Sequence, residues 1–77
     1  MHSIIPFPVT TRALVFGGDW ACAHGDIEAL AYIATQLSQR VDEPLGLELR
    51  ELAQLCNRDH ILASRRWPVL RDRLSPT

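Results

Sequence analysis

The chain has 77 residues, of which 47% are apolar and 22% are charged, and its formal net charge is −1. This length provides for one small domain with one hydrophobic core, and the composition is that of a folded chain rather than a disordered one. A pI of about 6.2 argues against a chain built mainly to neutralise phosphate, and the chain is too short to combine a core, a deep substrate pocket and a cofactor cradle.

Apolar runs in the sequence are short. The longest, at 29–34, covers six residues, whereas a membrane-spanning helix needs about 20. The start of the chain has no basic cluster, and Pro6 and Pro8 interrupt its apolar stretch, so it does not resemble a secretory signal. With only two cysteines, Cys22 and Cys56, the chain is not a disulfide-stapled miniprotein, and we expect it in the cytoplasm.

Residues 1–18 are expected to form an extended arm or a short β-hairpin. Two runs rich in Ile, Val and Phe, at 3–9 and 12–16, have strand propensity. The two prolines of the first run remove backbone donors, which confines it to an edge strand or an arm. The Gly17-Gly18 pair predicts a turn, and it lacks the further glycines, the Lys and the Ser or Thr of a phosphate-binding loop.

From Asp26 the apolar residues recur at helical spacing. This pattern predicts a helix over 27–41 with Asp26 as its N-cap. The apolar stripe of this helix consists of Ile27, Leu30, Ala34, Leu37 and Val41.

A second helix is predicted over 44–57, because Pro44 fits the first position of a helix. The link at 42–43 is short, so the two helices should pack antiparallel as an αα-hairpin with Leu52 near the centre of their contact. The stripe of the second helix consists of Leu45, Leu49, Leu52, Ala53 and Cys56.

A third helical segment begins after the expected N-cap Asp59. Pro68 interrupts it, which predicts either two short helices, at 60–66 and 68–74, or one kinked helix. The predicted fold is therefore a mainly α single domain, a small helical bundle. It comprises the αα-hairpin and a C-terminal helix broken near Pro68, with the helical core at 26–75 and the arm or hairpin ahead of it.

The favoured function is a small non-enzymatic protein–protein interaction or adaptor module. A small helical core can hardly cover an apolar arm, and a homodimer or a protein partner would hide it. We expect no cofactor and no membrane association. The candidate interface residues lie in the arm and in the last helix: Ile4, Ile5, Phe7, Val9, Arg65, Arg66, Trp67 and Arg71.

A zinc- or thiol-dependent site is the first alternative. Two sulfurs and two imidazoles are a legitimate tetrahedral zinc set, and this sequence supplies Cys22, His24, Cys56 and His60. The Cys-x-His spacing is unusual, however, and a helix start at Asp59 would separate the second pair. A thiol nucleophile would need a water-excluding cleft, for which the chain is too small, so we expect no enzyme.

Nucleic-acid binding is the second alternative. Every basic residue is an Arg; residues 1–49 carry two against six acidic residues, and residues 50–77 carry six against three. We expect the two oppositely charged halves to pair when the chain folds. The alternative is an exposed basic face that meets an acidic partner. Asp59 and Asp72 break up the basic face, which favours a solvated helix surface. The arginines concerned are Arg58, Arg65, Arg66, Arg71 and Arg73.

The two tryptophans, Trp20 and Trp67, lie at predicted element junctions. In so small a protein we expect both to seal the ends of the core. The alternative for Trp67 is an interface anchor, because Trp and Arg are the favoured hot-spot residues.

Overall fold

A computed structural model describes residues 10–74 of the chain. The described part is a small helical bundle, which confirms the predicted fold class. The arm residues Ile4, Ile5, Phe7 and Val9 lie outside the described residues. Four helices make up most of the described span: α1 (Thr11–His24), α2 (Ile27–Ser38), α3 (Leu45–Arg58) and α4 (His60–Leu74).

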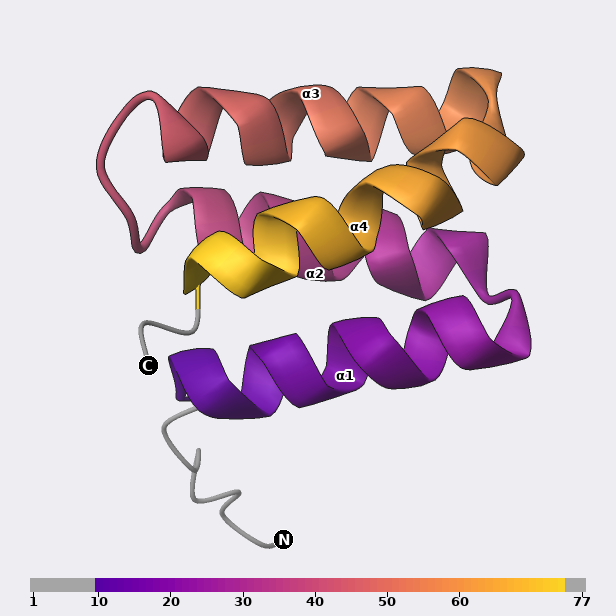
Figure 1. Ribbon diagram of the computed structural model, residues 1–77, viewed down its shortest axis with the longest axis horizontal. Helices are drawn as coiled ribbons and strands as arrows, with labels where there is room; N and C mark the ends of the chain where they lie inside the picture. Colours follow the sequence, from indigo (N-terminus) through magenta and orange to yellow (C-terminus); the bar gives the residue numbers. More distant parts are fainter. Residues whose placement is uncertain (1–9, 75–77) are drawn as a thin grey trace, which may run out of the picture.

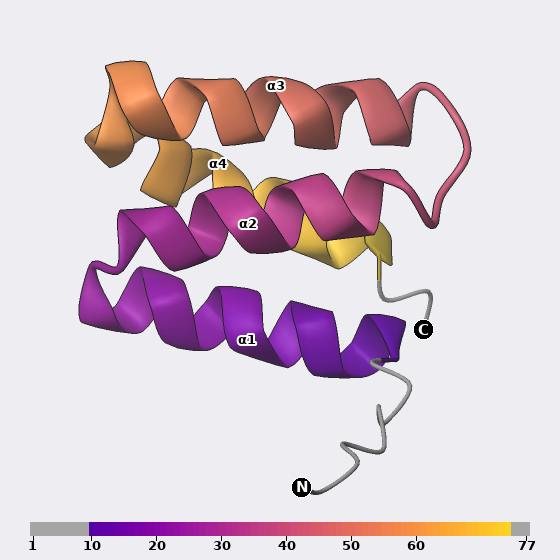
Figure 2. The same cartoon turned by 180° about the vertical axis from the view of Figure 1, so that it is seen from behind.

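The first three helices lie side by side, each antiparallel to the one before it, and α4 lies across one face of this layer (Figure 1). The reverse view shows α2 between α1 and α3 (Figure 2). The largest helix–helix contact joins α2 to α3, as expected for an αα-hairpin, and α4 packs on α3 and reaches α1. α1 is therefore an edge helix, with α2 and α4 on its inner side.

Side chains and a glycine define the helix ends. Thr10, Asp26 and Asp59 each accept a hydrogen bond from the backbone N–H three residues later, at 3.0, 3.1 and 3.1 Å. Each of these residues satisfies a donor that the first helical turn leaves free. Gly25 ends α1 at φ 69°, in the left-handed region that glycine adopts without strain. The predicted caps at Asp26 and Asp59 are confirmed.

The predicted strand at 12–16 and the predicted turn at Gly17-Gly18 are wrong, because both segments lie inside α1. Gly18 is buried, and a Cβ there would overlap the indole ring of Trp67. This glycine therefore serves the close approach of α4 to α1 rather than a change of chain direction. The helical core begins at residue 11, not at 26.

α4 is one helix that continues through Pro68, so the predicted alternative of two separate helices is wrong. Proline removes one backbone donor from the helix. Pro68 lies on the exposed side of α4, where the ring does not interrupt the packed face of the helix.

The core lies where the four helices meet. Leu52 is fully buried in it, as predicted. Trp67 is 1% exposed and seals the contact of α4 with α1, whereas Trp20 is 53% exposed, so the expectation that both tryptophans seal the core is wrong for Trp20. No helix within residues 10–74 has the length and apolar character needed to cross a membrane.

Candidate functional site

α1 is apolar on both of its sides. Its inner side buries Leu14, Gly18 and Ala21 against the bundle. Of its 14 residues, the only ones with polar side chains are Thr11, Arg12, Asp19 and His24. A surface helix ordinarily carries polar residues opposite its buried stripe, and a helix that is apolar all round is ordinarily covered all round. The outer side of α1 is therefore the unusual surface of this molecule.

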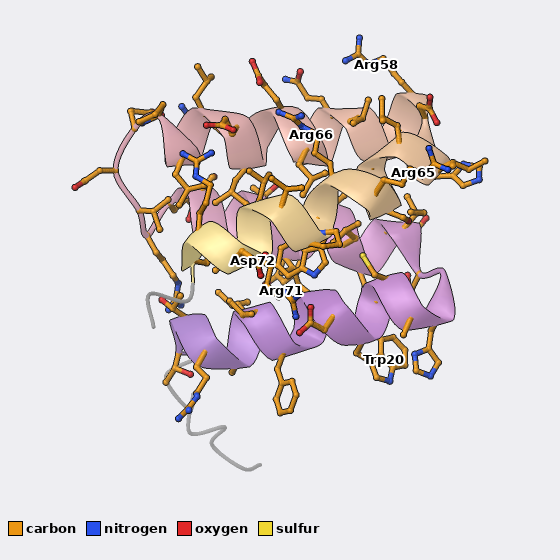
Figure 3. All side chains as sticks on the ribbon, in the orientation of Figure 1. Trp20, Arg58, Arg65, Arg66, Arg71 and Asp72 are labelled. Carbon is orange, nitrogen blue, oxygen red and sulfur yellow. The ribbon has the colours of Figure 1, made fainter. Side chains whose placement is uncertain are left out.

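Two large aromatic side chains stand on that outer side. Phe16 is 76% exposed and Trp20, one turn later, is 53% exposed. In Figure 3 Trp20 points away from the other three helices. A shallow hollow of about 500 Å³ lies beside these two rings and is lined only from α1, by Phe16, Gly17, Asp19, Trp20, Ala23 and His24. We call the surface formed by Phe16, Gly17, Trp20, Ala23 and His24 the aromatic face of α1.

The ring of Trp20 is held in place by His24. The two rings stack with their centroids 4.1 Å apart and their planes 17° from parallel. Nδ1 of His24 lies 2.9 Å from the backbone carbonyl oxygen of Trp20 and donates to it in the tautomer protonated at Nδ1. The stack limits the rotamers of the indole, and a side chain with fewer rotamers loses less entropy when it becomes buried.

The inner side of α1 is fixed by Asp19. Its Oδ1 accepts a hydrogen bond from the indole Nε1 of Trp67 at 2.8 Å, and its Oδ2 lies 3.4 Å from Nη1 of Arg71. These contacts set the rotation of α1 about its own axis. Asp19 therefore contacts α4, and Trp20, the next residue, points outward (Figure 3).

The two cysteines are free thiols, with Cys22 half-buried and Cys56 buried. Burial raises the pKa of both thiols, and the negative charge of Asp19 raises the pKa of Cys22 further. A raised pKa keeps each sulfur protonated and therefore weakly nucleophilic. This environment is the opposite of the one that activates a catalytic cysteine.

The four candidate zinc ligands are not brought together. Within residues 10–74, no three side chains of His, Cys, Asp or Glu gather in a way that could hold a metal ion. His24 is stacked on Trp20 at the end of α1. Cys56 belongs to α3 and His60 opens α4, because Asp59 caps a new helix between them.

The Arg-rich helix pairs with the acidic half of the chain, as expected from the charge distribution. Arg73 lies 2.8 Å and Arg66 lies 3.9 Å from Glu48, and Arg71 pairs with Asp19. The interpretation of Arg71 as a solvated surface residue is wrong, since it is half-buried and ion-paired. Trp67 is buried, so in this fold its indole is not available to a partner.

Two further arginines, at the end of α3 and in α4, are not ion-paired in this way within residues 10–74. Arg58 and Arg65 are exposed, and neither has a carboxylate within 4 Å among the described residues. Figure 3 shows both at the end of the bundle where α3 passes into α4.

The reading of the sequence missed Phe16 and Trp20 as candidate interface residues. Their spacing of four places both on one side of a helix, but only if residues 11–24 are recognised as helical. The available signals were Thr10 as an N-cap and Gly25 just past the C-terminus. The sequence matches no known family model, and comparisons with curated proteins and with solved structures find no match.

Proposed function

We propose that this protein is a non-enzymatic interaction module that forms a homodimer through the aromatic face of α1. The observation that carries the proposal is the exposure of Phe16 and Trp20, one turn apart, on a helix that is already apolar on its buried side. A contiguous exposed apolar surface of this kind marks an interaction site. Trp is also among the residues that contribute most to binding energy at interfaces.

The shape of the aromatic face favours a second copy as its occupant. The face holds both projecting rings, at Phe16 and Trp20, and a hollow beside them whose lining includes Gly17, Asp19 and Ala23. When two identical surfaces pair about a twofold axis, each projection meets the hollow of the other copy. Small residues beside the rings also let the two α1 helices approach closely.

Charges near the ends of the helix favour an antiparallel pair. Arg12 is exposed in the first turn of α1, and Asp26 and Glu28 are exposed just beyond its last turn. Two antiparallel copies place the Arg12 end of one helix beside the acidic end of the other. The opposed helix dipoles add to this attraction, and charge complementarity of this kind fixes the orientation of a complex.

The apolar arm precedes this surface directly in the sequence. Residues 1–9 lead into Thr10, the N-cap of α1, and they bring Ile4, Ile5, Phe7 and Val9. We propose that these residues extend the dimer contact from the start of α1. The cytoplasm is the compartment that suits the proposal, because both cysteines are free thiols.

Sedimentation velocity over a dilution series tests the proposal. The wild type should form a dimer that dissociates on dilution, and Trp20→Gln should be monomeric at concentrations where the wild type is dimeric. Tyr32→Gln is the matched control, since Tyr32 is a 63% exposed aromatic residue on α2 and lies outside the aromatic face. The homodimer is refuted if the wild type stays monomeric throughout, and the aromatic face is refuted as its interface if Trp20→Gln associates as the wild type does.

A further inference from the structure

A second surface lies between α3 and α4, away from the aromatic face of α1. It is a groove of about 370 Å³, lined from α3 and α4 by Glu51, Gln54, Leu55, Arg58, Leu62 and Arg66. α2 separates the α3 side of the layer from α1 (Figure 2). The groove therefore remains open when two α1 helices pair.

The groove has an apolar strip along it. Leu55 is half-buried on the α3 side, and Leu62 is 46% exposed on the α4 side. Val69 lies beyond the lining of the groove, two turns after Leu62 on the same side of α4, and is 59% exposed. Leu62 and Val69 are seven residues apart, a separation that another helix would match with its own apolar residues.

Positive charge borders this strip and is weakly compensated. Arg58 lines the groove, and Arg65 lies outside its lining on α4, three residues after Leu62. Neither has a carboxylate within 4 Å among residues 10–74. Arg66 lies 3.9 Å from Glu48, a carboxylate that Arg73 already binds at 2.8 Å. A guanidinium group pairs well with a carboxylate, because its planar fork matches the two oxygens.

We propose that this groove binds an acidic amphipathic helix of a partner protein. The apolar residues of that helix pack on Leu55, Leu62 and Val69, and its carboxylates pair with the arginines at the end of the groove. This is the helix-in-groove mode of recognition, with anchors at intervals of three, four and seven residues. Combined with the homodimer, it makes the protein an adaptor that presents two such grooves.

The lining of the groove favours an acidic helix over nucleic acid. A phosphate backbone would gain nothing from the leucine strip, whereas the apolar side of an amphipathic helix packs on it. Nucleic-acid surfaces combine basic residues with exposed aromatic rings on which bases stack. The lining of this groove contains no aromatic residue.

Fluorescence anisotropy with a labelled synthetic peptide tests the inference. The probe is a helical peptide of Glu and Leu with leucines at intervals of three and four, and a peptide of the same composition with the leucines scrambled is the reference. We expect the patterned peptide to bind and the scrambled one to bind at least about tenfold more weakly. Equal binding of the two peptides, or no binding of either, would overturn the inference.

Variants locate the site. Arg58→Gln combined with Arg65→Gln should weaken peptide binding by about tenfold, and Leu62→Gln should weaken it too. Arg40→Gln, an exposed arginine outside the groove, should leave binding unchanged. Peptide binding should persist in the Trp20→Gln variant, so the groove and the homodimer succeed or fail separately. A single-stranded oligonucleotide that binds more tightly than the peptide and is lost in the double Arg variant would contradict the inference in favour of nucleic acid.

Discussion

The indole Nε1 of Trp67 donates a hydrogen bond to Oδ1 of Asp19 at 2.8 Å and so joins the last helix to the first. The same indole lies on the backbone of Gly18. Together these contacts dock α1 with Asp19 inward, which leaves Trp20 on the outer side. The buried Trp67 thus determines the position of the exposed Trp20.

Removing the acceptor should destabilise the fold. Asp19→Ala leaves the buried indole N–H without a partner, and an unsatisfied buried donor costs about 1–3 kcal/mol of unfolding free energy. Asp19→Asn keeps an acceptor oxygen and loses the charge, so it should cost less. The ion pair with Arg71 adds little, at most about 1 kcal/mol, because both side chains are 38% exposed. Urea unfolding of the two variants measures the difference, and an Asp19→Asn variant less stable than Asp19→Ala would contradict this role of the oxygen.

The two adjacent glycines of α1 should respond differently to alanine. Gly18→Ala places a Cβ inside the indole of Trp67 and should cost about 1–3 kcal/mol, the usual range for overpacking. At Gly17 a Cβ would lie 3.0 Å from the terminal Cδ1 of Ile33, a side-chain end that can shift. Alanine in place of a helical glycine gains about 1 kcal/mol, so Gly17→Ala should be near neutral. Thermal unfolding compares the pair, and equal stability of the two variants would show that Trp67 does not constrain residue 18.

The contact between α2 and α3 should depend strongly on Leu52. Leu52 is fully buried, so Leu52→Ala should cost about 2–5 kcal/mol through lost burial and a residual cavity. A chain of this size has about 4–11 kcal/mol in total, and the variant should be close to unfolding. Leu47→Ala, on the exposed side of the same helix, should change stability by less than about 0.5 kcal/mol. Circular dichroism during urea titration distinguishes the two variants. A urea unfolding curve for Leu52→Ala like that of the wild type would contradict the packing of α2 on α3 as an αα-hairpin.

The cysteines should react slowly while the protein is folded. Burial raises the pKa of the Cys22 and Cys56 thiols, so at mildly alkaline pH the native state holds less thiolate than the unfolded chain. Alkylation by iodoacetamide should accordingly be much slower in buffer than in urea. Both thiols contribute stability that is complete below the pKa of the unfolded chain and is lost as the pH rises through the folded pKa. Rapid native alkylation of either cysteine would revive the thiol-dependent alternative.

The sequence predicted α2 and α3 well because the residues that specify each helix lie within or next to that helix. Each has one apolar stripe, and Asp26 caps α2 as predicted. α2 ends at Ser38 rather than at the predicted residue 41, so the link to α3 covers residues 39–44 rather than 42–43. α1 lacks that contrast, since its outer side is as apolar as its inner side. Its central glycines look like a turn until Trp67, some fifty residues later, is known to lie on Gly18. The same long-range contact decides which tryptophan is buried, and no pattern within residues 11–24 contains it.

The emission of Trp20 across a dilution series tests the homodimer most directly. Trp67 is 1% exposed and should emit as a buried indole at every concentration, whereas Trp20 is 53% exposed and enters the proposed interface. We predict that the emission maximum shifts to shorter wavelength as the protein is concentrated, over the range in which sedimentation shows dimer formation. An emission spectrum that stays unchanged while the protein dimerises would place the interface elsewhere and contradict the assignment of the aromatic face of α1.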